Sequence, residues 1–364
     1  MKAALISLES ESSKWTAEAM KKYFDDVDML NIRHIEISIS GKKAEILYKG
    51  KPLDSYDCIF AKGSFRYANL LKTLTLLING SSYMPISDRA FTFAHDKLLT
   101  QLEFQRNNIP MPTTYLASTI TAARSILERL NYPIVMKFPQ GTGGKGVLFA
   151  ESFASASSIL DALSSLRQPF IIQEFIETGG TDIRAFVIGD EVVAAYQRKA
   201  GKNEARSNIH AGGTGEEVEL DDETKRIAIK SAQALDADIC GVDILMTHKG
   251  PMVLELNLSP GLQGITKYTG IDVADKIAKY LAKRTKEKKG ASQQKGADKV
   301  LSVIDKADKK GDEVITSIDF RGSRVLLPEM VSRLVNFKED ADYEFVVKNG
   351  EVHIKKFEMK LTDE

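Results

Sequence analysis

The sequence predicts an α/β protein, α+β in its larger middle part, that ends in a small β-rich domain. Short apolar runs alternate with amphipathic stretches over residues 1–88, a pattern typical of a partly parallel sheet with helices. Between residues 182 and 257, strand-like runs follow one another across short polar or glycine-containing turns, which indicates hairpins. From Lys283 to Lys310 the composition changes to ten basic and four acidic residues, typical of a linker.

These changes of pattern divide the chain, whose 364 residues suit two or three domains. We expect an N-terminal α/β domain over residues 1–88 and a larger domain over 89–283, with a subdomain at about 112–176. A charged flexible linker is expected over 284–311 and a β-rich domain over 312–358.

Composition excludes several classes of function. Fifty basic and fifty acidic residues cancel, so no global field favours nucleic acid or a membrane surface. Cys58 and Cys240 lie in strand-like apolar runs and are expected to be reduced core residues. The apolar run that follows Met1 and Lys2 is too short for the core of a signal peptide, and no run in the sequence approaches about 18 apolar residues. We therefore expect a cytoplasmic protein.

The N-terminal elements follow in order. Strands are expected at Lys2–Leu8, Tyr56–Ala61 and Tyr83–Ile86, a hairpin at His34–Tyr48 and helices at Lys14–Phe24 and Arg66–Leu77. The segment Lys62–Ser64 directly follows a strand, where open α/β sheets place ligand loops, although a strand must also simply end.

The larger domain repeats the alternation. Helices are expected at Asp88–Asn107, Thr121–Leu130, Ser155–Leu166, Asp221–Asp236 and Asp272–Lys283. Strands are expected at Met111–Leu116, Tyr132–Phe138, Val147–Ala150, Pro169–Ile176, Asp182–Val187 and Glu191–Lys199.

A glycine-rich loop, GTGGKG over Gly141–Gly146, lies between two of these strands. A dinucleotide fingerprint would open a helix, and a Walker A loop would end in Lys-Ser or Lys-Thr, so neither fits. A protein kinase would need H-R-D and D-F-G motifs, which are absent. The remaining interpretation is a hairpin loop whose backbone amides cover phosphates, with Lys137 before it supplying a point charge.

Three oxygen ligands are expected on the hairpin that begins at Cys240. If it folds about Lys249, Asp243 pairs with Glu255, and Asn257 shares the face of Glu255 because it lies two residues further on. Adjacent buried carboxylates repel unless a cation lies between them, and oxygen ligands suit Mg²⁺ or Mn²⁺. The alternative is a set of edge-strand polar residues that face water.

These motifs occur in the order typical of ATP-grasp enzymes. The strings DIRAFVIGDEVVAA, RSNIHAGG and GVDIL…LELNLSPGLQGI closely resemble RimK-type α-L-glutamate ligases. The resemblance covers roughly residues 80–283 strongly and the N-terminal domain, which would be a pre-ATP-grasp domain, loosely. It implies an ATP-grasp fold and an ADP-forming acid–amino acid ligase that uses ATP with Mg²⁺ or Mn²⁺.

The resemblance also implies roles for particular residues. ATP phosphates would be held by Lys97, Lys137, Gly143, Gly144 and Gly146, and their outer end by Arg206 and Asn208. A hinge would hold adenine through Gln173, Glu174, Phe175 and Ile176, and either Glu177 or Asp182 would take the ribose. The metal would be held by Asp243, Glu255 and Asn257. Charge in the transition state would be stabilised by Arg184, Arg198 and Arg206.

Substrate contacts are expected from Arg184, Arg198, Ser259 and Gly261. The two arginines are candidates for bidentate contacts with a substrate carboxylate or acyl phosphate, and the alternative is that they are surface residues of a strand.

The C-terminal segment from Ile315 to Lys356 resembles AbrB/SpoVT-type swapped-hairpin domains, which dimerise and sometimes bind DNA. Asn349-Gly350 is a strong hairpin turn. Residues 312–364 carry eight basic and twelve acidic residues, and DNA binding needs a positive surface. We therefore expect a homodimer or homotetramer, or partner docking, rather than DNA binding.

The expected function is the addition of L-glutamate to a protein, peptide or cofactor acceptor, for example a protein C-terminus. Alternatives are a ligase that acts on an amino-group carrier protein of lysine or arginine biosynthesis, or on a deazaflavin or pterin cofactor. An alternative of another class is an ATP-binding sensor or DNA-binding regulator.

Overall fold

A computed structural model of the chain describes residues 1–78, 80–138, 146–165, 170–199, 214–304, 319–321, 324–327, 338, 341–348 and 351–356. The chain divides into two compact units, Met1–Ala291 and Ser292–Glu364. No helix among the described residues is both long enough and apolar enough to cross a membrane. Each unit is described by itself.

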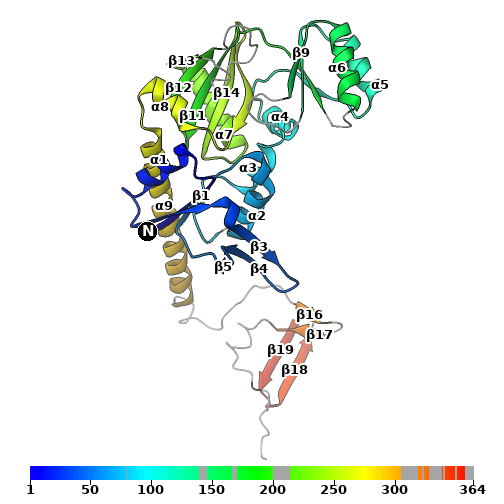
Figure 1. The fold of residues 1–364 in the computed structure, drawn as a ribbon. Coiled ribbons are helices and arrows are strands. Elements are labelled where there is room, and N and C mark those ends of the chain that lie inside the picture. The colour runs from blue at the N-terminus through cyan, green and yellow to red at the C-terminus, as the bar shows by residue number, and fades with distance from the viewer. Residues whose placement is uncertain are drawn as a thin grey trace, which may run out of the picture. The chain divides into compact units, whose positions relative to one another are not determined.

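The N-terminal region is built on a parallel sheet in the order β2-β1-β6 (Figure 1). Its strands are β1 (Lys2–Ser7), β2 (Asp26–Asn31) and β6 (Cys58–Ala61). The sequence did not predict β2, because acidic residues interrupt its apolar pattern. Two of these acids pair with Lys2, whose Nζ lies 3.1 Å from Asp28 and 3.6 Å from Asp26. The helices of this region are α1 (Glu11–Met20), α2 (Ala68–Ile78) and the short η1 (Ile32–His34) and η2 (Phe65–Tyr67).

A second, antiparallel sheet accompanies it, with strands β3 (Ile35–Ile39), β4 (Ala44–Tyr48) and β5 (Lys51–Pro52). This confirms the expected hairpin. The strand expected at Tyr83–Ile86 is wrong: only single bridges form, from Tyr83 to Cys58 and from Ile86 to Ala237. Pro85 has no N–H group with which to continue a ladder.

The single helix expected over Asp88–Asn107 is two helices, α3 (Asp88–Phe93) and α4 (Lys97–Arg106). Asp96 separates them, because its carboxylate accepts hydrogen bonds from the amides of Leu98 and Leu99 at 2.9 and 3.0 Å. This N-cap satisfies two amides that otherwise have no partner and makes Lys97 the first residue of α4.

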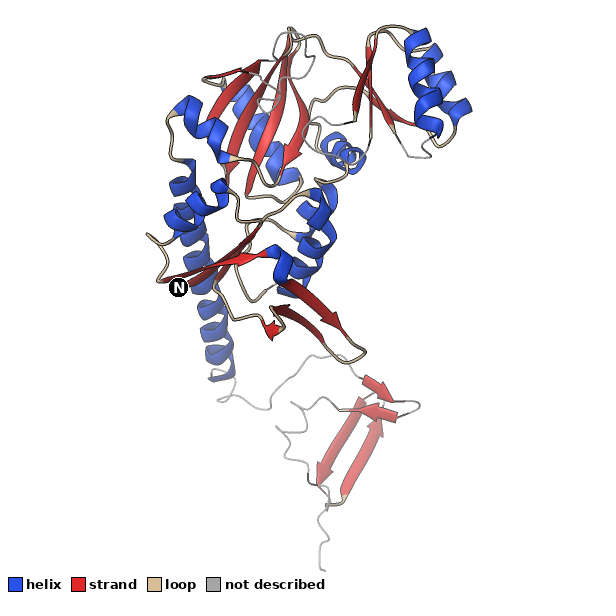
Figure 2. Ribbon diagram, viewed as in Figure 1, coloured by secondary structure: helices blue, strands red, loops and turns tan. Residues whose placement is uncertain are grey.

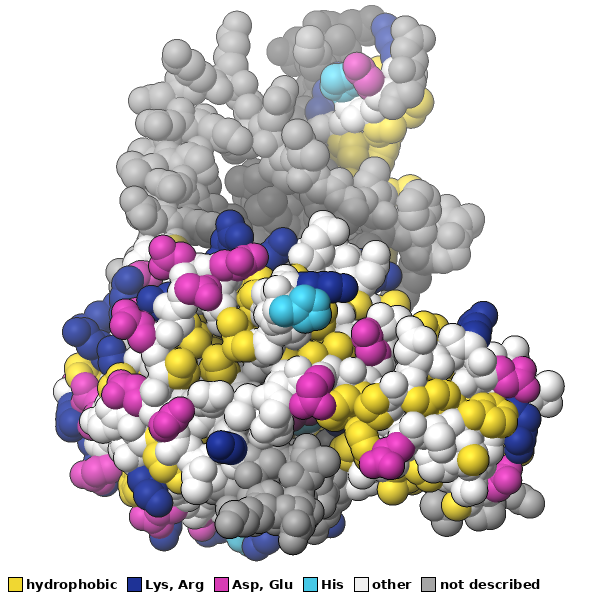
Figure 3. Space-filling model, turned by 90° about the horizontal axis from the view of Figure 1, so that it is seen from above, with side chains coloured by type: hydrophobic (Ala, Val, Ile, Leu, Met, Phe, Trp, Pro, Cys, Tyr) yellow, Lys and Arg dark blue, Asp and Glu magenta, His cyan; other side chains and the backbone are white. Residues whose placement is uncertain are grey.

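A separate lobe carries a four-stranded sheet in the order β7-β10-β8-β9, covered on one side by two helices (Figures 1 and 2). Its elements are β7 (Thr114–Leu116), α5 (Ile120–Glu128), β8 (Ile134–Lys137), β9 (Val147–Ala150), α6 (Phe153–Ser165) and β10 (Ile171–Glu174). The lobe has its own hydrophobic core, built by residues between Ala123 and Ile172. Figure 3 shows further apolar side chains on its surface.

The largest sheet has five antiparallel strands in the order β13-β12-β11-β14-β15 (Figure 1). They are β11 (Thr181–Ile188), β12 (Glu191–Lys199), β13 (Thr214–Glu217), β14 (Ile239–Thr247) and β15 (Gly250–Asn257). One core extends from this sheet into the N-terminal region, so the two regions fold as one body. Helix α7 (Asp222–Ala234) packs on the sheet, and α8 (Leu262–Thr269) is a helix that the sequence did not predict.

The last helix, α9, runs from Val273 to Ile304 and crosses the limit between the two units. The segment expected as a flexible linker over 284–311 is therefore helical as far as Ile304. Side-chain pairs such as Arg284–Glu287 suit a helix, and Lys289 binds Asp57 at 2.8 Å. Beyond it, the described residues of the C-terminal unit pair as β16 (Asp319–Arg321) with β17 (Arg324–Leu326) and as β18 (Tyr343–Lys348) with β19 (Glu351–Lys356), both antiparallel.

Candidate nucleotide and metal site

A β-bulge sets the register of the metal-site hairpin. Thr247 pairs with Gly250, so the turn is centred between His248 and Lys249, and that register alone would place Leu254 opposite Asp243. The register shifts between Asp243 and Ile244, and Glu255 becomes the partner of Asp243. The predicted pairing is confirmed, but an extra residue in β15 produces it.

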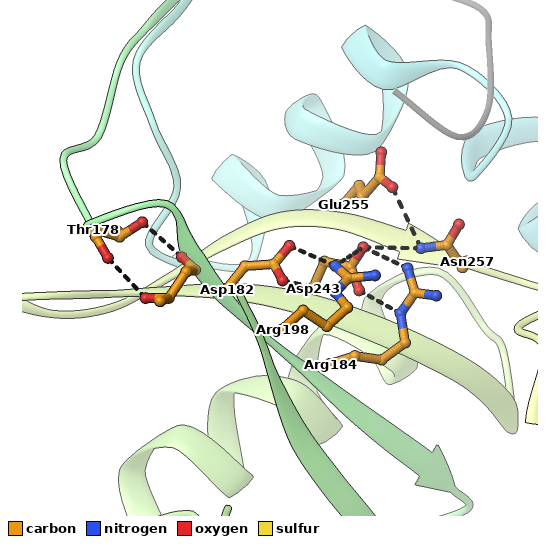
Figure 4. Close-up of polar contacts among 8 residues, drawn as sticks. Thr178, Asp182, Arg184, Arg198, Asp243, Glu255 and Asn257 are labelled. Carbon is orange, nitrogen blue, oxygen red and sulfur yellow. Dashed lines mark hydrogen bonds and ion pairs between the residues drawn. The ribbon is translucent and has the colours of Figure 1, made fainter. Parts of the chain in front are cut away.

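Two arginines converge on Asp243 (Figure 4). Arg184 lies opposite Asp243 on β11, and its Nε and Nη2 donate to the two carboxylate oxygens at 2.7 Å each. Arg198, on β12, lies 2.9 Å from Asp243. It also binds Asp182, its cross-strand partner on β11, with an Nε–Oδ1 distance of 2.7 Å. Arg198 is buried and Arg184 is half-buried, and both are bound to carboxylates, so the alternative of surface arginines is wrong.

The arginines determine the charge of Asp243. Burial alone would raise the pKa of this carboxyl, but the guanidinium groups of Arg184 and Arg198 outweigh burial and hold that pKa well below its ordinary value. Gly241 leaves space beside them, since a Cβ atom there would lie 3.1 Å from Pro260 and 3.6 Å from Arg184. Asp243 is therefore a fixed carboxylate at neutral pH.

The chemistry of the donor set fits a divalent cation. Asn257 Nδ2 lies 3.4 Å from both Asp243 Oδ2 and Glu255 Oε1, so the three side chains share one patch of the sheet (Figure 4). Turning the amide would present Oδ1 in the same place. The described residues hold no group of three or more His, Cys, Asp or Glu suited to a metal, and this set has only two carboxylates. Two carboxylates and an amide oxygen suit Mg²⁺ with water or phosphate completing its shell.

Lys137 is held across the sheet of the separate lobe. Its Nζ donates to Gln173 Oε1 at 2.7 Å, and Gln173 Nε2 donates to Thr114 Oγ1 at 2.7 Å. Gln173 therefore fixes the ammonium group of Lys137. Its side-chain amide is occupied by Lys137 and Thr114, so it is not free to contact adenine at the hinge. Sequence reasoning missed Thr114, which the register identifies because it lies opposite Gln173 on β7.

Burial lowers the pKa of Lys137 to about 8, with a smaller contribution from Lys97 in the same direction. The charge of Glu255 acts in the opposite direction. Lys137 is thus close enough to Lys97 and Glu255 to respond to both charges, which brings together residues that the sequence places far apart.

The other predicted residues are placed as follows. Gly146 has a φ of +76°, and a Cβ atom there would lie 2.7 Å from the Phe138 ring, so only glycine fits. Phe175 packs edge-to-face against Phe149 with centroids 5.0 Å apart. Glu177 accepts a hydrogen bond from the amide of Gly179 at 2.8 Å.

Further positions complete the picture. The amide of Thr113 donates to Glu174 at 3.3 Å. Gly261 is the N-cap of α8 and follows Ser259 closely. Ile176 lies between β10 and β11. The remaining predicted residues lie outside the described part of the chain: Gly143, Gly144, Arg206 and Asn208.

Comparison with known proteins identifies the family of this chain. A family model described as the RimK-like ATP-grasp domain matches residues 94–281. A probable alpha-L-glutamate ligase of Thioalkalivibrio sulfidiphilus is 34% identical over 305 residues, which cover 81% of this chain and 100% of that protein. A probable alpha-L-glutamate ligase of Vibrio atlanticus is 36% identical over 276 residues, covering 74% and 91%.

Solved structures share the fold. A RimK domain ATP-grasp protein from Sphaerobacter thermophilus has a TM-score of 0.61 and 19% identity, and covers 77% of this chain and 99% of its own. The ATP-grasp ligase PsnB, complexed with a minimal precursor, Mg and ADP, has a TM-score of 0.61 and 17% identity, covering 78% and 98%. The family model ends at residue 281, so the resemblance of the C-terminal unit to AbrB/SpoVT-type domains stays a prediction.

Proposed function

Because this chain belongs to the RimK-like ATP-grasp family and is an ATP-dependent, ADP-forming carboxylate–amine ligase, we propose that it adds L-glutamate to a protein, peptide or cofactor acceptor. The observation that carries the proposal is the patch of Asp243, Glu255 and Asn257, with the charge of Lys137 near enough to Glu255 to respond to it.

The proposed chemistry has two steps. A carboxylate oxygen of the acceptor attacks the terminal phosphorus of ATP, so that an acyl phosphate and ADP form. The amine of the amino acid then attacks the acyl carbon, loses a proton and expels phosphate as the new amide bond forms. Both steps move negative charge, which fixed cations stabilise without reorganisation.

The residues of this chain support both steps. Lys137 and Lys97 hold phosphate oxygens as point charges. Arg184 and Arg198 contribute charge around Asp243, and a new anion beside them would compete for their N–H groups. Mg²⁺ or Mn²⁺, when bound by Asp243, Glu255 and Asn257, neutralises the triphosphate.

Nucleotide binding by the hinge follows from the same arrangement. We infer that adenine contacts the backbone of Glu174–Ile176 and the apolar surface near Phe149 and Phe175, because the Gln173 side chain holds Lys137. Of the two ribose candidates, Asp182 is bound bidentately by Arg198, which favours Glu177.

The proposal is tested by incubating the protein with ATP, Mg²⁺ and L-glutamate, alone and with desalted cell extract, and analysing nucleotides and products by mass spectrometry. ADP with glutamate-extended products is the expected result. ADP formed only with another amino acid would replace the substrate, for example in favour of a carrier-protein ligase. AMP, or tight ATP binding without turnover, would contradict the acyl-phosphate route and favour a nucleotide sensor.

The metal assignment predicts the effect of one charge. Glu255→Gln keeps the size of the side chain but removes a carboxylate from the patch, and we expect ADP formation to fall by at least about a hundredfold. Glu191→Gln makes the same change at an exposed position of the same sheet and should leave the rate unchanged. Near-wild-type turnover of Glu255→Gln would remove the metal assignment.

A further inference from the structure

Lys62 differs from the other buried charged side chains of the described residues. Only 5% of Lys62 is exposed. Glu103, Asp243 and Lys137, which are similarly buried, each bind a partner. Lys62 Nζ has no hydrogen bond or ion pair within the described residues; it makes only a cation–π contact with Phe60, whose ring centroid lies 5.7 Å away. Burial lowers the pKa of Lys62 to about 8.

A lysine in this state costs stability, because most of the side chain has lost water and its ammonium group faces no counter-charge among the described residues. Met or Leu would fill the same volume without that cost. A functional reason is therefore expected, and the missing partner is an anion that the described residues do not supply.

The position of Lys62 in the sheet indicates a ligand site. The parallel sheet has the order β2-β1-β6, so the chain leaves β1 towards β2 on one side and returns to β6 on the other. Ligands bind outside the carboxyl ends of strands at such a switch point. Lys62 is the first residue after β6, and its amide donates to the carbonyl of Ile6 in β1 at 2.9 Å, which places it at this point.

The same edge of the sheet contacts the segment that follows the metal-site hairpin. The loop after β1 holds Glu9 with a φ of 59°, a conformation that side chains rarely adopt and that is often retained at functional sites. Ser12, just beyond it, accepts a hydrogen bond from the amide of Leu262 at 2.9 Å and donates to Gln263 at 2.8 Å. Leu262 lies five residues after Asn257, so this edge adjoins the candidate site.

We propose that Lys62 is a substrate-binding residue whose ammonium group pairs with a carboxylate of a substrate. This inference rests on the proposed function, in which both the amino acid and the acceptor carry carboxylates. In the proposed function Lys137 and Lys97 serve the phosphates of ATP, so Lys62, at the end of β6 in a different sheet, is available for the second anion. Pairing would compensate the buried charge only when substrate is bound, and so links Lys62 to substrate selection.

The test uses the full chain and its Lys62→Met variant, with Lys14→Met, which removes an exposed lysine of α1, as the control. Each protein is titrated with L-glutamate, 4-aminobutyrate and tri-L-glutamate in the presence of a non-hydrolysable ATP analogue and Mg²⁺. Thermal unfolding and binding of the ATP analogue are measured on the same samples.

We expect Lys62→Met to weaken L-glutamate binding about 10- to 100-fold, the effect of one charged hydrogen bond. Binding of 4-aminobutyrate, which lacks the α-carboxylate, should not change if that carboxylate is the partner. A loss confined to tri-L-glutamate would identify the acceptor as the source of the carboxylate. ATP-analogue affinity should be unchanged and the unfolding temperature should rise, because an unpaired buried charge is gone.

Equal binding of all probes by wild type and Lys62→Met would overturn the inference, and so would a fall in unfolding temperature, which indicates a structural lysine. If the wild type binds none of the probes, both the inference and the proposed function are wrong. If the wild type binds L-glutamate but forms no ADP from ATP when L-glutamate and desalted cell extract are both present, the proposed function alone fails.

Discussion

Lys137 sits between an amide oxygen and two charges from other parts of the chain. The Gln173 oxygen fixes its position, burial and Lys97 favour its neutral form, and Glu255 favours its charged form. A lysine with a pKa near 8 is only partly charged in mildly alkaline solution, and only the ammonium form attracts phosphate.

This balance predicts a pH dependence of nucleotide binding. The pKa in the free protein is about 8, and phosphate would raise it in the complex, so ATP affinity should be constant below pH 8 and decrease above it. Lys137→Arg keeps its charge throughout this range and should lose the dependence. Calorimetric ATP titrations between pH 7 and 9.5 measure both proteins, and identical profiles would contradict this role of Lys137.

The pair of Arg198 and Asp182 predicts an effect on stability. Arg198→Met leaves the buried carboxylates of Asp182 and Asp243 without this partner, and we expect the free energy of unfolding to fall by about 3–5 kcal/mol. Adding Asp182→Asn removes the charge of one of these two carboxylates and should recover part of the lost free energy of unfolding. Urea denaturation of both single variants and the double variant gives the coupling energy. Additive losses would argue that the two side chains act independently.

At the scale of the element, the cap of α4 decides where Lys97 lies. Asp96→Ala removes the acceptor for two amides and should cost about 0.5–2 kcal/mol of stability. Because the first turn of α4 would fray, ATP binding should weaken as well. Asp96→Asn preserves the cap and is expected to behave like the wild type. Thermal unfolding and ATP titration of the two variants check this. If Asp96→Ala were as stable as Asp96→Asn and bound ATP equally well, the cap would not be what positions Lys97.

The bulge in β15 acts on the same scale. A strand presents alternate residues on opposite faces, so a one-residue slip would turn Glu255 and Asn257 away from Asp243. The bulge adds one residue to β15 and keeps Glu255 and Asn257 on the patch. The chemistry of the site therefore depends on a local irregularity of an otherwise regular hairpin.

At the scale of the whole molecule, the two cores have different consequences. The N-terminal region and the five-stranded sheet share one core, which holds the edge containing Lys62 firmly beside the segment after Asn257. The lobe with Lys137 has a core of its own. A nucleotide that contacts both Lys137 and the metal ligands would connect two separately packed bodies.

The C-terminal unit predicts association. Phe345, Val347 and Val352 share one face of the β18–β19 hairpin and are 64%, 69% and 58% exposed. A two-stranded hairpin needs a packed face to be stable in water, and a second copy would supply it. Sedimentation should show a dimer or tetramer that Phe345→Ser with Val347→Ser dissociates. Glu344→Ser, on the opposite face, should not change the mass, and a monomeric wild type would refute the interpretation.

Sequence alone indicated the type of most elements of the larger domain and the residue types of the candidate site, because periodicity, turns and oxygen-bearing side chains are local properties. It did not show β2, β13 or α8, the break at Asp96, or the helical continuation of α9, because ion pairs, caps and packing with distant segments decide these.

Only the tertiary structure showed that Arg184 and Arg198 both bind Asp243, that Gln173 holds Lys137, and that Lys62 is buried without a hydrogen bond or ion pair among the described residues. Burial and pairing are properties of the packed chain. They depend on which strands become neighbours, and residues such as Lys137 and Glu255, more than a hundred positions apart, influence each other only after folding.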